Sequence, residues 1–525
     1  MRYITRSSDG FYHPANEDEI RYLIKRANQD GLTVRVRGAA HSVGAAIYTD
    51  GFAKGKRDEK EINMMLDKMI DITFDDEKMQ VTAQGGCHLG EDPADPTKSS
   101  TVENSLLYQV DQRGWAIPST GGIIHQTVSG FLSTGSSGGS MTYSISDHIV
   151  AIRLIDGNGK THELSEASYR DKFYAAGVSM GLLGIITAVT FQCMPKFHLI
   201  GHEETTKIAD SKVDLFGTGT ADKPDLQSFL ENTEYARLLW WPQKGVEKVT
   251  VWQGRPMQPR DYTAQTGSPE NFRPKPYEQF PVILFSGQLS QILSGIYYRL
   301  IKRWNSPGLL GKITRGFLKL TLAPIINLFA STVGKEGTQK FWDTWWKALP
   351  MDKSLSDKWL PFHFSELWIP ISRTREVMNK LKEHYGNNGV WATAAYPCEI
   401  YVKKSSKFWM SPAYERDVVK INLFWFAKNK ENPATTYFPQ FWELLREFDV
   451  RFHWGKYFPD GPPVGPEFLR TRYPHWDDFM DIRAEMDPNQ IFVTDYWRKH
   501  LAIEPQSKPG KTAPRTATAR KSFLS

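Results

Sequence analysis

The sequence is poor in cysteine and carries little net charge. Of its 525 residues only Cys87, Cys193 and Cys398 are cysteines, and they lie too far apart for a metal-ligand pattern. Such low usage is typical of proteins in a reducing compartment. The formal net charge is +6, and no long block of lysine and arginine precedes residue 500. The sequence therefore predicts neither a metal site nor a nucleic-acid partner.

The two ends of the chain lack targeting signals. The first residues, Met1 to Arg6, lead directly into domain-like sequence without the apolar stretch of a secretory signal, so we expect an intracellular location. The last residues, Pro505 to Ser525, are rich in Lys, Arg, Ser, Thr and Pro, and we expect them to be disordered. They do not end in a peroxisomal tripeptide.

The composition is that of a globular protein, with 40% hydrophobic and 24% charged residues. A chain of 525 residues exceeds the size at which one core stops growing, so two packed domains are expected. Aromatic residues make up 13% of the chain and include 17 tryptophans. Such side chains suit a pocket for a planar cofactor or an apolar substrate, although most of them are explained as large core residues.

The spacing of apolar residues and turn residues predicts a mixture of helices and hairpins. The expected elements are a helix from Pro14 through Ala27 that Gly31 ends, a strand at 34–37, a hairpin of 70–74 with 80–84, a second hairpin of 149–155 with 161–164, a helix over 169–180 and a strand over 184–194. This mixture indicates an α+β fold rather than a regular doubly wound sheet.

No GxGxxG motif follows the first expected strand, which weakens the case for an ordinary Rossmann nucleotide site. Two other glycine-rich loops are present, at 38–44 and at 119–140. Glycine lets backbone N–H groups approach an anion closely, and serine and threonine add donors. Two such loops near the N-terminus favour a nucleotide phosphate site over two solvated turns.

Motifs in matching order at both ends of the chain resemble those of one flavoprotein family. VRVRGAAHS at 34–42 resembles the pyrophosphate-binding loop of the vanillyl-alcohol-oxidase (PCMH) type of FAD domain. Further stretches are similar to the aldonolactone oxidoreductases, the group that contains gulonolactone oxidase, arabinonolactone oxidase and alditol oxidase: TVSG at 127–130, LIDGNG at 154–159, GLLGIITAVT at 181–190, SPAYERD at 411–417, HWGK at 453–456 and MDPNQIF at 486–492. Several ordered motifs are far more specific than one.

The resemblance implies a two-domain α+β fold in which an FAD-binding PCMH-type domain, residues 1–200, is covered by an α+β cap or substrate domain, residues 201–450. Residues 451–500 would return to the flavin. The resemblance and the glycine-rich loops together give these candidate cofactor-binding residues: Arg37, Gly38, Ala39, Ala40, His41, Ser42, Ser119, Gly121, Gly122, Thr127, Gly130, Ser133, Thr134, Gly135, Ser137, Gly184, Ile185, Ile186 and Lys456.

His41 occupies the position at which members of this family with covalent flavin carry the histidine attached to the 8α-methyl group of FAD. A neutral imidazole nitrogen is a good nucleophile near neutral pH, so the attachment is chemically reasonable. The alternative is a histidine that only hydrogen-bonds its loop. The resemblance also places Lys456 beside flavin and substrate, where a positive charge would stabilise the anionic reduced ring. His453 is the second candidate in that motif, although it could equally be a packing residue.

The expected substrate end departs from the family pattern. Glu399 retains the acid of a Glu-x-Arg pair that contacts a polyol or lactone, but Tyr401 stands where the arginine is expected. Tyrosine offers one hydroxyl on an apolar ring in place of a fork of five donors. Ser136-Ser137-Gly138 replaces Thr-His-Gly, and Phe131 stands where a polar residue would meet substrate. Each change makes the expected pocket less suited to a small hydrophilic sugar.

An extra segment between Pro281 and Gly334 contains six basic residues and no acidic one: Arg299, Lys302, Arg303, Lys312, Arg315 and Lys319. Apolar patches lie between these bases, but polar residues and a proline interrupt the longer ones, so no spanning helix is expected. A basic amphipathic segment fits a peripheral membrane contact, or a lid over a lipophilic substrate. The alternative is an ordinary insertion packed on the cap domain.

The sequence thus predicts an FAD-dependent oxidoreductase that oxidises a CH–OH group of an aldonolactone- or alditol-like alcohol by hydride transfer, with catalytic candidates Lys456, Glu399, Tyr401 and His453. The electron acceptor would be O₂ or another molecule. One alternative is an oxidase or dehydrogenase of a larger lipophilic or natural-product alcohol at a membrane surface. Another is an inactive flavin-binding scaffold protein.

Overall fold

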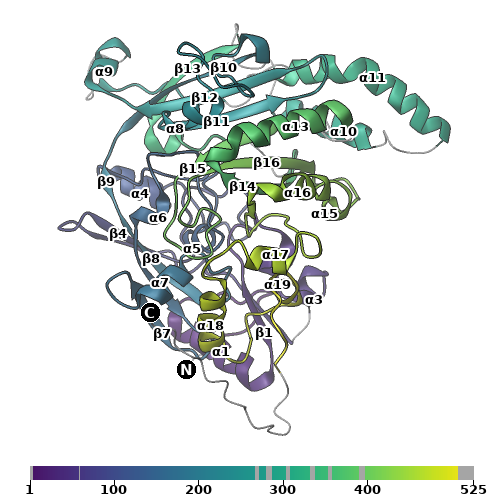
Figure 1. The fold of residues 1–525 in the computed structure, drawn as a ribbon. Coiled ribbons are helices and arrows are strands. Elements are labelled where there is room, and N and C mark those ends of the chain that lie inside the picture. The colour runs from purple at the N-terminus through teal and green to yellow at the C-terminus, as the bar shows by residue number, and fades with distance from the viewer. Residues whose placement is uncertain are drawn as a thin grey trace, which may run out of the picture.

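The computed structural model describes residues 4–57, 60–265, 271–278, 287–302, 308–330, 337–352, 358–388 and 396–506. Its elements build two large antiparallel sheets with helices around them (Figure 1). The five-stranded sheet comes from residues before 200 and the eight-stranded sheet from residues after 195. The expected α+β class is therefore confirmed. Of the tail that is expected to be disordered, residues 507–525 lie outside the described residues.

The N-terminal helix α1 (Glu17–Asp30) begins three residues after the expected Pro14 and ends at Gly31 as the sequence indicates. The Asn16 side chain accepts a hydrogen bond from the Glu19 N–H at its start, and Gly31 ends it with φ 65°, a conformation that favours glycine. Strand β1 (Thr33–Val36) follows at once and pairs in parallel with β2 (Glu61–Met64). The chain then enters the glycine-rich loop at 38–44, so β1 fixes where that loop starts.

The five-stranded sheet contains both expected hairpins. Its order is β3 (Ile72–Asp75), β4 (Gln80–Gln84), β8 (Ile185–Gln192), β6 (Ile149–Ile155) and β7 (Thr161–Ser165), and every neighbouring pair is antiparallel. The helix expected over 169–180 is shorter, since α7 covers only Arg170–Ala176. The next residue is Gly177, where a Cβ would overlap the Phe408 ring. Residues 178–184 form a loop instead.

Short elements connect the five-stranded sheet to the rest of the molecule. They are α2 (Gly44–Ile47), α3 (Asp50–Ala53), α4 (Leu106–Gln112), β5 (Trp115–Ala116), α5 (Val128–Ser133), α6 (Ile145–His148) and β9 (Met194–Pro195). Thr127 caps α5 by accepting a hydrogen bond from the Gly130 N–H at 3.2 Å.

The eight-stranded sheet is antiparallel throughout and carries the second half of the site. Its order is β13 (Thr338–Thr344), β10 (His198–Lys207), β12 (Lys248–Pro256), β11 (Tyr235–Trp241), β15 (Cys398–Lys403), β16 (Val418–Phe426), β14 (Phe362–Pro370) and β17 (Arg451–Phe452). Every residue of β15 and β16 is buried, so both faces of the central strands are covered.

Helices cover the outer face of this sheet (Figure 1). They include α8 (Leu226–Glu231), α13 (Thr374–Asn388), α15 (Pro433–Thr436) and α16 (Pro439–Leu445), with α9 (Pro259–Gln265) and α12 (Trp345–Ala348) near the opposite edge. Trp240 of β11 packs edge-on against Tyr385 of α13, with ring centroids 5.2 Å apart. Because side chains alternate along a strand, the neighbours of Trp240 point to the other face of the sheet.

The C-terminal segment returns to the N-terminal elements through α17 (Pro466–Arg470), α18 (Trp476–Met486) and α19 (Asp495–Leu501) (Figure 1). The Trp497 indole N–H donates to the Ala46 carbonyl at 2.9 Å, and the Val34 N–H donates to the Ile491 carbonyl at 2.7 Å. Ile491 and Phe492 share a core cluster with residues of α1 and β1. The last described elements therefore brace the strand that leads into the glycine-rich loop.

The basic segment forms two helices, α10 (Gly287–Lys302) and α11 (Gly308–Ala330), and α11 reaches outward from the cap (Figure 1). Tyr297 of α10 and Leu322 and Ile326 of α11 are buried against Trp241 and Val246. Within the described ranges, no helix combines the length and apolar character needed to cross a membrane.

Candidate active site

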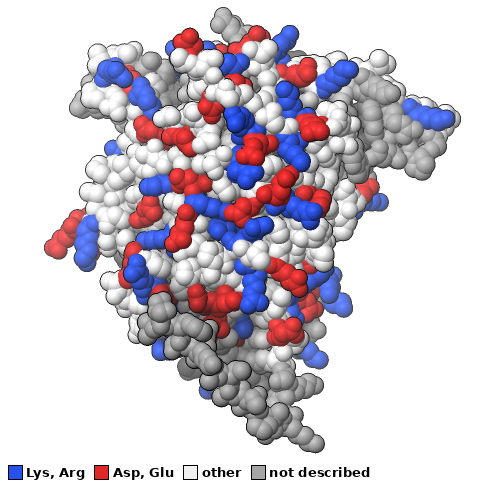
Figure 2. Space-filling model, in the orientation of Figure 1, with Lys and Arg blue, Asp and Glu red and all other residues white. Residues whose placement is uncertain are grey.

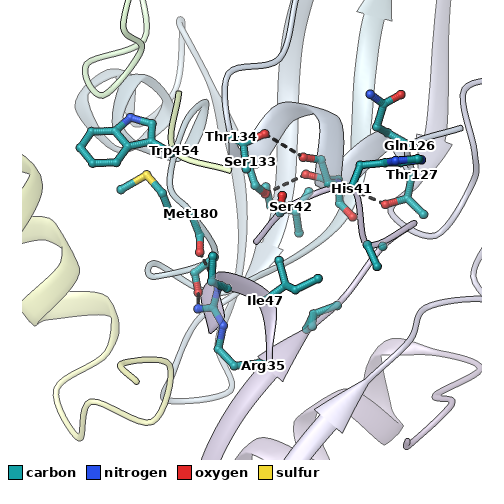
Figure 3. Close-up of a pocket in the computed structure, with 18 of the residues that line it drawn as sticks. Arg35, His41, Ser42, Ile47, Gln126, Thr127, Ser133, Thr134, Met180 and Trp454 are labelled. Carbon is teal, nitrogen blue, oxygen red and sulfur yellow. Dashed lines mark hydrogen bonds between the residues drawn. The ribbon is translucent and has the colours of Figure 1, made fainter. Parts of the chain in front are cut away.

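A deep cavity lies between the glycine-rich loop after β1, the N-terminal turn of α5, the 180–186 segment and the C-terminal segment. It encloses about 1030 Å³ including its open mouth, and we call it the cofactor cavity. Figure 3 shows His41, Ser42, Thr127 and Ser133 grouped along one side of it, with Arg35 and Met180 at the other end.

Arg35 holds the walls of the cofactor cavity together. Its guanidinium is buried and donates to the carbonyl groups of Ala46 at 2.7 Å, Met180 at 2.8 Å and Phe492 at 3.1 Å (Figure 3). Burial lowers the pKa of Arg35 to about 10. The side chain is still charged at neutral pH, so three separate segments are fixed around one cation.

Glycines of the two loops, and Gly184 in the 180–186 segment, let neighbouring atoms approach the backbone closely. A Cβ at Gly38 would overlap the Thr127 hydroxyl, and one at Gly184 would overlap the Ile155 carbonyl oxygen. In the second loop, a Cβ at Gly138 or Gly139 would overlap the carbonyl oxygens of Thr120 and Ala236 respectively. Gly38 and Gly184 line the cofactor cavity. Gly138 and Gly139 instead let the second loop fold on itself and pack against β11.

A second cavity, the substrate cavity, lies between the second glycine-rich loop and the inner face of the eight-stranded sheet. It encloses about 1590 Å³ including its open mouth. Its floor is polar at one end, with Glu366, Glu399, Tyr401, Lys420 and Asn422, and aromatic at the other. The aromatic end and its approach are lined by Leu360, Pro361, Phe362, Phe364, Phe424 and Tyr457.

The two cavities share one wall. Seven residues line both of them: Ala40, His41, Ser42, Gln126, Ser136, His453 and Lys456. A group bound in the cofactor cavity would therefore meet a group bound in the substrate cavity beside the His41 loop and the 453–456 segment.

His41 is held as a neutral imidazole. Burial, followed by the nearby charge of Lys456, lowers the pKa of His41 to about 3. Its ring lies 5.5 Å from the ring of His125. At neutral pH one ring nitrogen therefore carries an available lone pair, which is the form that can act as a nucleophile.

Lys456 reaches the same loop from the other end of the chain. Its ammonium group donates to the His41 carbonyl oxygen at 3.2 Å and lies 4.7 Å from the centre of the Phe364 ring. The lysine lines both cavities, so its charge is directed to their junction.

His453 is also neutral, and its hydrogen bonds identify its tautomer. Burial lowers the pKa of His453 to about 4. The Gly455 N–H donates to Nδ1 at 3.0 Å, so the ring proton is assigned to Nε2, which lies 3.3 Å from the Ser136 hydroxyl. His453 therefore orients Ser136 at the junction of the two cavities.

An arginine that the sequence did not indicate lies beside Tyr401. Arg237 of β11 pairs directly with Tyr401 of β15 in the antiparallel ladder, so both side chains project from the same face. The guanidinium is buried and lies 2.6 Å from Asp352 and 3.5 Å from Glu399. The positive charge that is missing from position 401 is thus supplied by the neighbouring strand.

Most candidate residues line one of the cavities. Those of the cofactor cavity are Gly38, Ala39, Ala40, His41, Ser42, Thr127, Gly130, Ser133, Thr134, Gly184, Ile185, Ile186, His453 and Lys456, and those found on the substrate side are Gly121, Gly122, Ser137, Glu399 and Tyr401. Arg37 lines a smaller adjoining cavity of about 340 Å³.

Three expectations differ from the structure. Phe131 is buried in α5 and lines neither main cavity, so it cannot be the substrate-facing residue that the resemblance suggests. Ser119 and Gly135 also line neither. Ser119 is buried, and Gly135 adopts φ 72° at the end of α5. Their contribution is therefore to the course of the loop.

Several site residues were missed from the sequence. Lys420, Asn422 and Phe424 alternate with buried aliphatic residues along β16, and this period of two could have indicated them. Asp352 follows α12 without any local signal. Its N–H donates to the Gly122 carbonyl at 2.8 Å, a contact between two segments that are 230 residues apart.

The residues present fit an FAD group. The cofactor cavity joins glycines without room for a Cβ to serine and threonine hydroxyls and a neutral histidine, which suits a pyrophosphate and a planar ring. Gln126 Oε1 at the junction of the cavities and Ser137 Oγ in the substrate cavity are buried and form no hydrogen bond with the described part of the protein. Polar atoms of this kind are available to a bound group.

Known sequence families match both halves of the chain. The family described as FAD binding domain matches residues 8–91 and 100–165, and the family described as D-arabinono-1,4-lactone oxidase matches residues 317–500. L-gulonolactone oxidase of Mus musculus is 26% identical over 94% of this chain and 95% of its own length. L-gulono-1,4-lactone dehydrogenase of Mycobacterium tuberculosis is 24% identical over 93% and 95% respectively.

Solved structures show the same fold at low sequence identity. A cholesterol oxidase from Brevibacterium sterolicum, studied as a His121Ala mutant, is 14% identical and superposes with a TM-score of 0.68 over 94% of both chains. The described fold, the two joined cavities and the matches along both halves of the sequence agree with one another. The chain therefore belongs to the aldonolactone oxidoreductase family of PCMH-type FAD flavoproteins and is an FAD-dependent oxidoreductase.

Proposed function

We propose that this protein oxidises a CH–OH group of an aldonolactone, with FAD bonded covalently to His41. The observation that carries the proposal is the shared wall of the two cavities, where His41 and Lys456 meet a polar floor formed by β14, β15 and β16. When bound there, FAD supplies an acceptor for a hydride from the carbinol carbon. The chain would supply orientation, a positive charge and a route for the hydroxyl proton.

The polar end of the substrate cavity favours a hydrophilic substrate. Lys420 and Asn422 line it with donors beside Glu399 and Tyr401, and Arg237, which does not line the cavity, holds Glu399 from the neighbouring strand. The relatives include both gulonolactone and arabinonolactone oxidases. Both observations support a polyhydroxylated lactone over an inert scaffold role.

The aromatic end supports a second candidate. Phe362, Phe364 and Phe424 form an apolar wall, and Tyr298 of α10 packs on Phe362 with ring centroids 5.8 Å apart. A larger lipophilic alcohol could place its carbinol at the polar end and its apolar body along this wall.

A panel of reductants distinguishes these candidates. The holoenzyme is mixed anaerobically with aldonolactones, alditols and apolar alcohols, and loss of the visible flavin absorbance is recorded. We expect bleaching by an aldonolactone, because the polar floor can bind several hydroxyl groups. Readmission of air then shows whether O₂ is the electron acceptor. Bleaching only by apolar alcohols would support the second candidate, and no bleaching by any member would refute the oxidation of carbinols.

The covalent bond to His41 is supported by its neutral ring at the junction of the cavities. We expect the flavin to remain with the protein pellet after acid precipitation of the wild type. In His41→Ala it should appear in the supernatant, whereas His384→Ala, a change on α13, should behave as the wild type. Flavin released from the wild-type pellet would contradict the bond.

We also propose peripheral contact between α10–α11 and an anionic membrane surface. Leu309, Ile313, Phe317 and Leu320 lie at helical spacing on α11 and are 49–80% exposed, while Leu322 and Ile326 face the body. Lys312 and Arg299 are exposed on the same two helices. By contrast, charges of both signs are interspersed over the face of the molecule in Figure 2.

Vesicle flotation tests this contact. The wild type should float with vesicles of phosphatidylcholine and phosphatidylserine and less with phosphatidylcholine alone, because basic residues flank the apolar face. Ile313→Asp/Phe317→Asp should stay at the bottom of the gradient. Tyr169→Asp removes an aromatic side chain that is 63% exposed elsewhere and serves as the control. Equal flotation of the double variant and the wild type would refute the contact.

An intracellular location is part of the same proposal. It is supported by Cys87, Cys193 and Cys398, which are free and buried, as expected for a chain that folds in a reducing compartment.

A further inference from the structure

A cluster of polar side chains closes the deep end of the substrate cavity. It consists of Arg237 on β11, Glu399 and Tyr401 on β15, Asn422 on β16, and Asp352 after α12. Strand register explains how it forms, since Arg237 pairs with Tyr401 and Glu399 pairs with Asn422. Glu399 and Tyr401 are two residues apart and therefore share the inner face of the sheet.

The hydrogen bonds of the cluster form a connected path. Tyr401 Oη lies 2.8 Å from Glu399 Oε1 and 3.3 Å from Asp352 Oδ2. The Asn422 amide donates to Glu399 Oε2 at 2.8 Å. One hydroxyl thus stands between two carboxyl groups, and it can accept a proton from one while donating its own to the other.

Burial gives this path a direction. The side chains of Glu399 and Arg237 are 4% and 3% exposed, whereas that of Asp352 is 19% exposed. Both carboxyl groups line the cavity, and Glu399 is the more enclosed of the two while Asp352 is the more accessible to water.

Arg237 fixes the spacing of the two carboxyl groups. Its Nη1 donates to Asp352 at 2.6 Å and lies 3.5 Å from Glu399, and its Nη2 lies 3.3 Å from the Tyr277 hydroxyl. The Tyr277 hydroxyl in turn donates to Glu203 at 2.7 Å. Arg237 is not a lining residue of the cavity, so it acts through the groups that it holds.

We propose that Glu399, Tyr401 and Asp352 form the path by which the hydroxyl proton of the substrate leaves the cavity, with Arg237 as its positioning residue. The proposal rests on the oxidation of a carbinol proposed above. Tyrosine at position 401 is essential to it, because an arginine has five donors and no acceptor and could not pass a proton on. With the guanidinium on β11, the charge is kept beside Glu399 and position 401 carries a hydroxyl.

The proton and electron balance of the step is simple. The substrate O–H bond breaks and its proton passes to the Glu399 carboxylate, while the C–H electron pair leaves with hydrogen as the hydride that the flavin accepts, and a C=O bond forms. Protonated Glu399 then donates to Tyr401 Oη, whose own proton passes to Asp352 Oδ2 and from there to water. Tyr401 is neutral before and after the transfer.

Charges around Glu399 suit it to this role. Burial, with the negative charge of Asp352, raises the pKa of Glu399 to about 7, and the Arg237 charge and the hydrogen bonds from Tyr401 and Asn422 oppose the rise. Lys420 faces the Tyr401 ring from β16 at 4.8 Å, and Glu366 of β14 lies 3.9 Å from Lys420. A base with such a pKa gains and loses a proton easily at physiological pH.

The other titratable groups at the junction are already engaged by the protein. Lys456 is a donor to the His41 carbonyl, and its charge depresses the pKa of His41. Both ring nitrogens of His453 already have partners, and its pKa is lowered to about 4. Glu399 is therefore the proton acceptor that the geometry favours.

Infrared difference spectroscopy of the holoenzyme tests the coupling without any substrate. Between pH 5 and 9 we expect a protonated carboxyl band with a midpoint near 7 that is absent in Glu399→Gln. Removal of a negative neighbour in Asp352→Asn should lower the midpoint, and removal of a positive one in Arg237→Met should raise it, whereas Arg237→Lys should restore it. A midpoint equal to that of the wild type in both Asp352→Asn and Arg237→Met would overturn the shared path.

Anaerobic flavin reduction tests the transfer itself. Because the base must be ionised, the rate should rise with pH through about 7 and then level off. Glu399→Gln should reduce it about 100-fold, and Tyr401→Phe and Asp352→Asn roughly 10-fold, mainly in kcat. Tyr235→Phe, a buried hydroxyl on β11 that bonds the Pro118 carbonyl, is the matched control and should react within about twofold of the wild type.

The outcomes separate this inference from the proposed function. Wild-type rates in Tyr401→Phe and Asp352→Asn would overturn the proton path while leaving the oxidation intact. If no carbinol reduces the wild-type flavin, the proposed function fails, and the proton path fails with it whatever the infrared midpoints show. Flavin absorbance of each variant verifies that it has folded around its cofactor.

Discussion

The site depends on the contact between the Lys456 ammonium group and the His41 carbonyl oxygen. These residues are 415 positions apart, and the hydrogen bond of 3.2 Å between them joins the C-terminal segment to the first glycine-rich loop. Arg35 and Trp497 stabilise the same junction, since both donate hydrogen bonds to the Ala46 carbonyl. The cofactor cavity is completed only when the last part of the chain packs against the first. The charge that we propose to serve the reaction therefore also closes the fold.

Local chemistry made the cofactor side predictable. The α1 helix follows from its apolar period and from Gly31, and β6 occupies 149–155 as the pattern indicated. The loop around His41 follows a strand, as the family motif implies, and its glycines are required by contacts such as that of Gly38 with Thr127. These features are local or belong to a continuous motif. A single sequence carries such information directly.

The substrate side could not be predicted in the same way, because it is assembled by strand register and by distant segments. Tyr401 alone suggested the loss of a guanidinium, but its partner on β11 is 164 residues earlier and becomes its neighbour only through sheet pairing. Asp352 reaches the cluster through a contact with Gly122. The family motif places Phe131 at the substrate, whereas its side chain is buried in the core beneath α5. The polar end of the cavity is thus more hydrophilic than the substitution at position 401 implied.

In the proposed function the returning C-terminal segment brings the positive charge of Lys456 to the bound flavin. The midpoint reduction potential of the bound flavin tests it most directly, in Lys456→Met and in the control Lys499→Met, which removes a surface lysine paired with Asp460. Loss of the Lys456 charge should lower the potential by about 30 mV or more, equivalent to about 1.4 kcal/mol for two electrons. The control should match the wild type. An unchanged potential in Lys456→Met would contradict this role of the Lys456 charge.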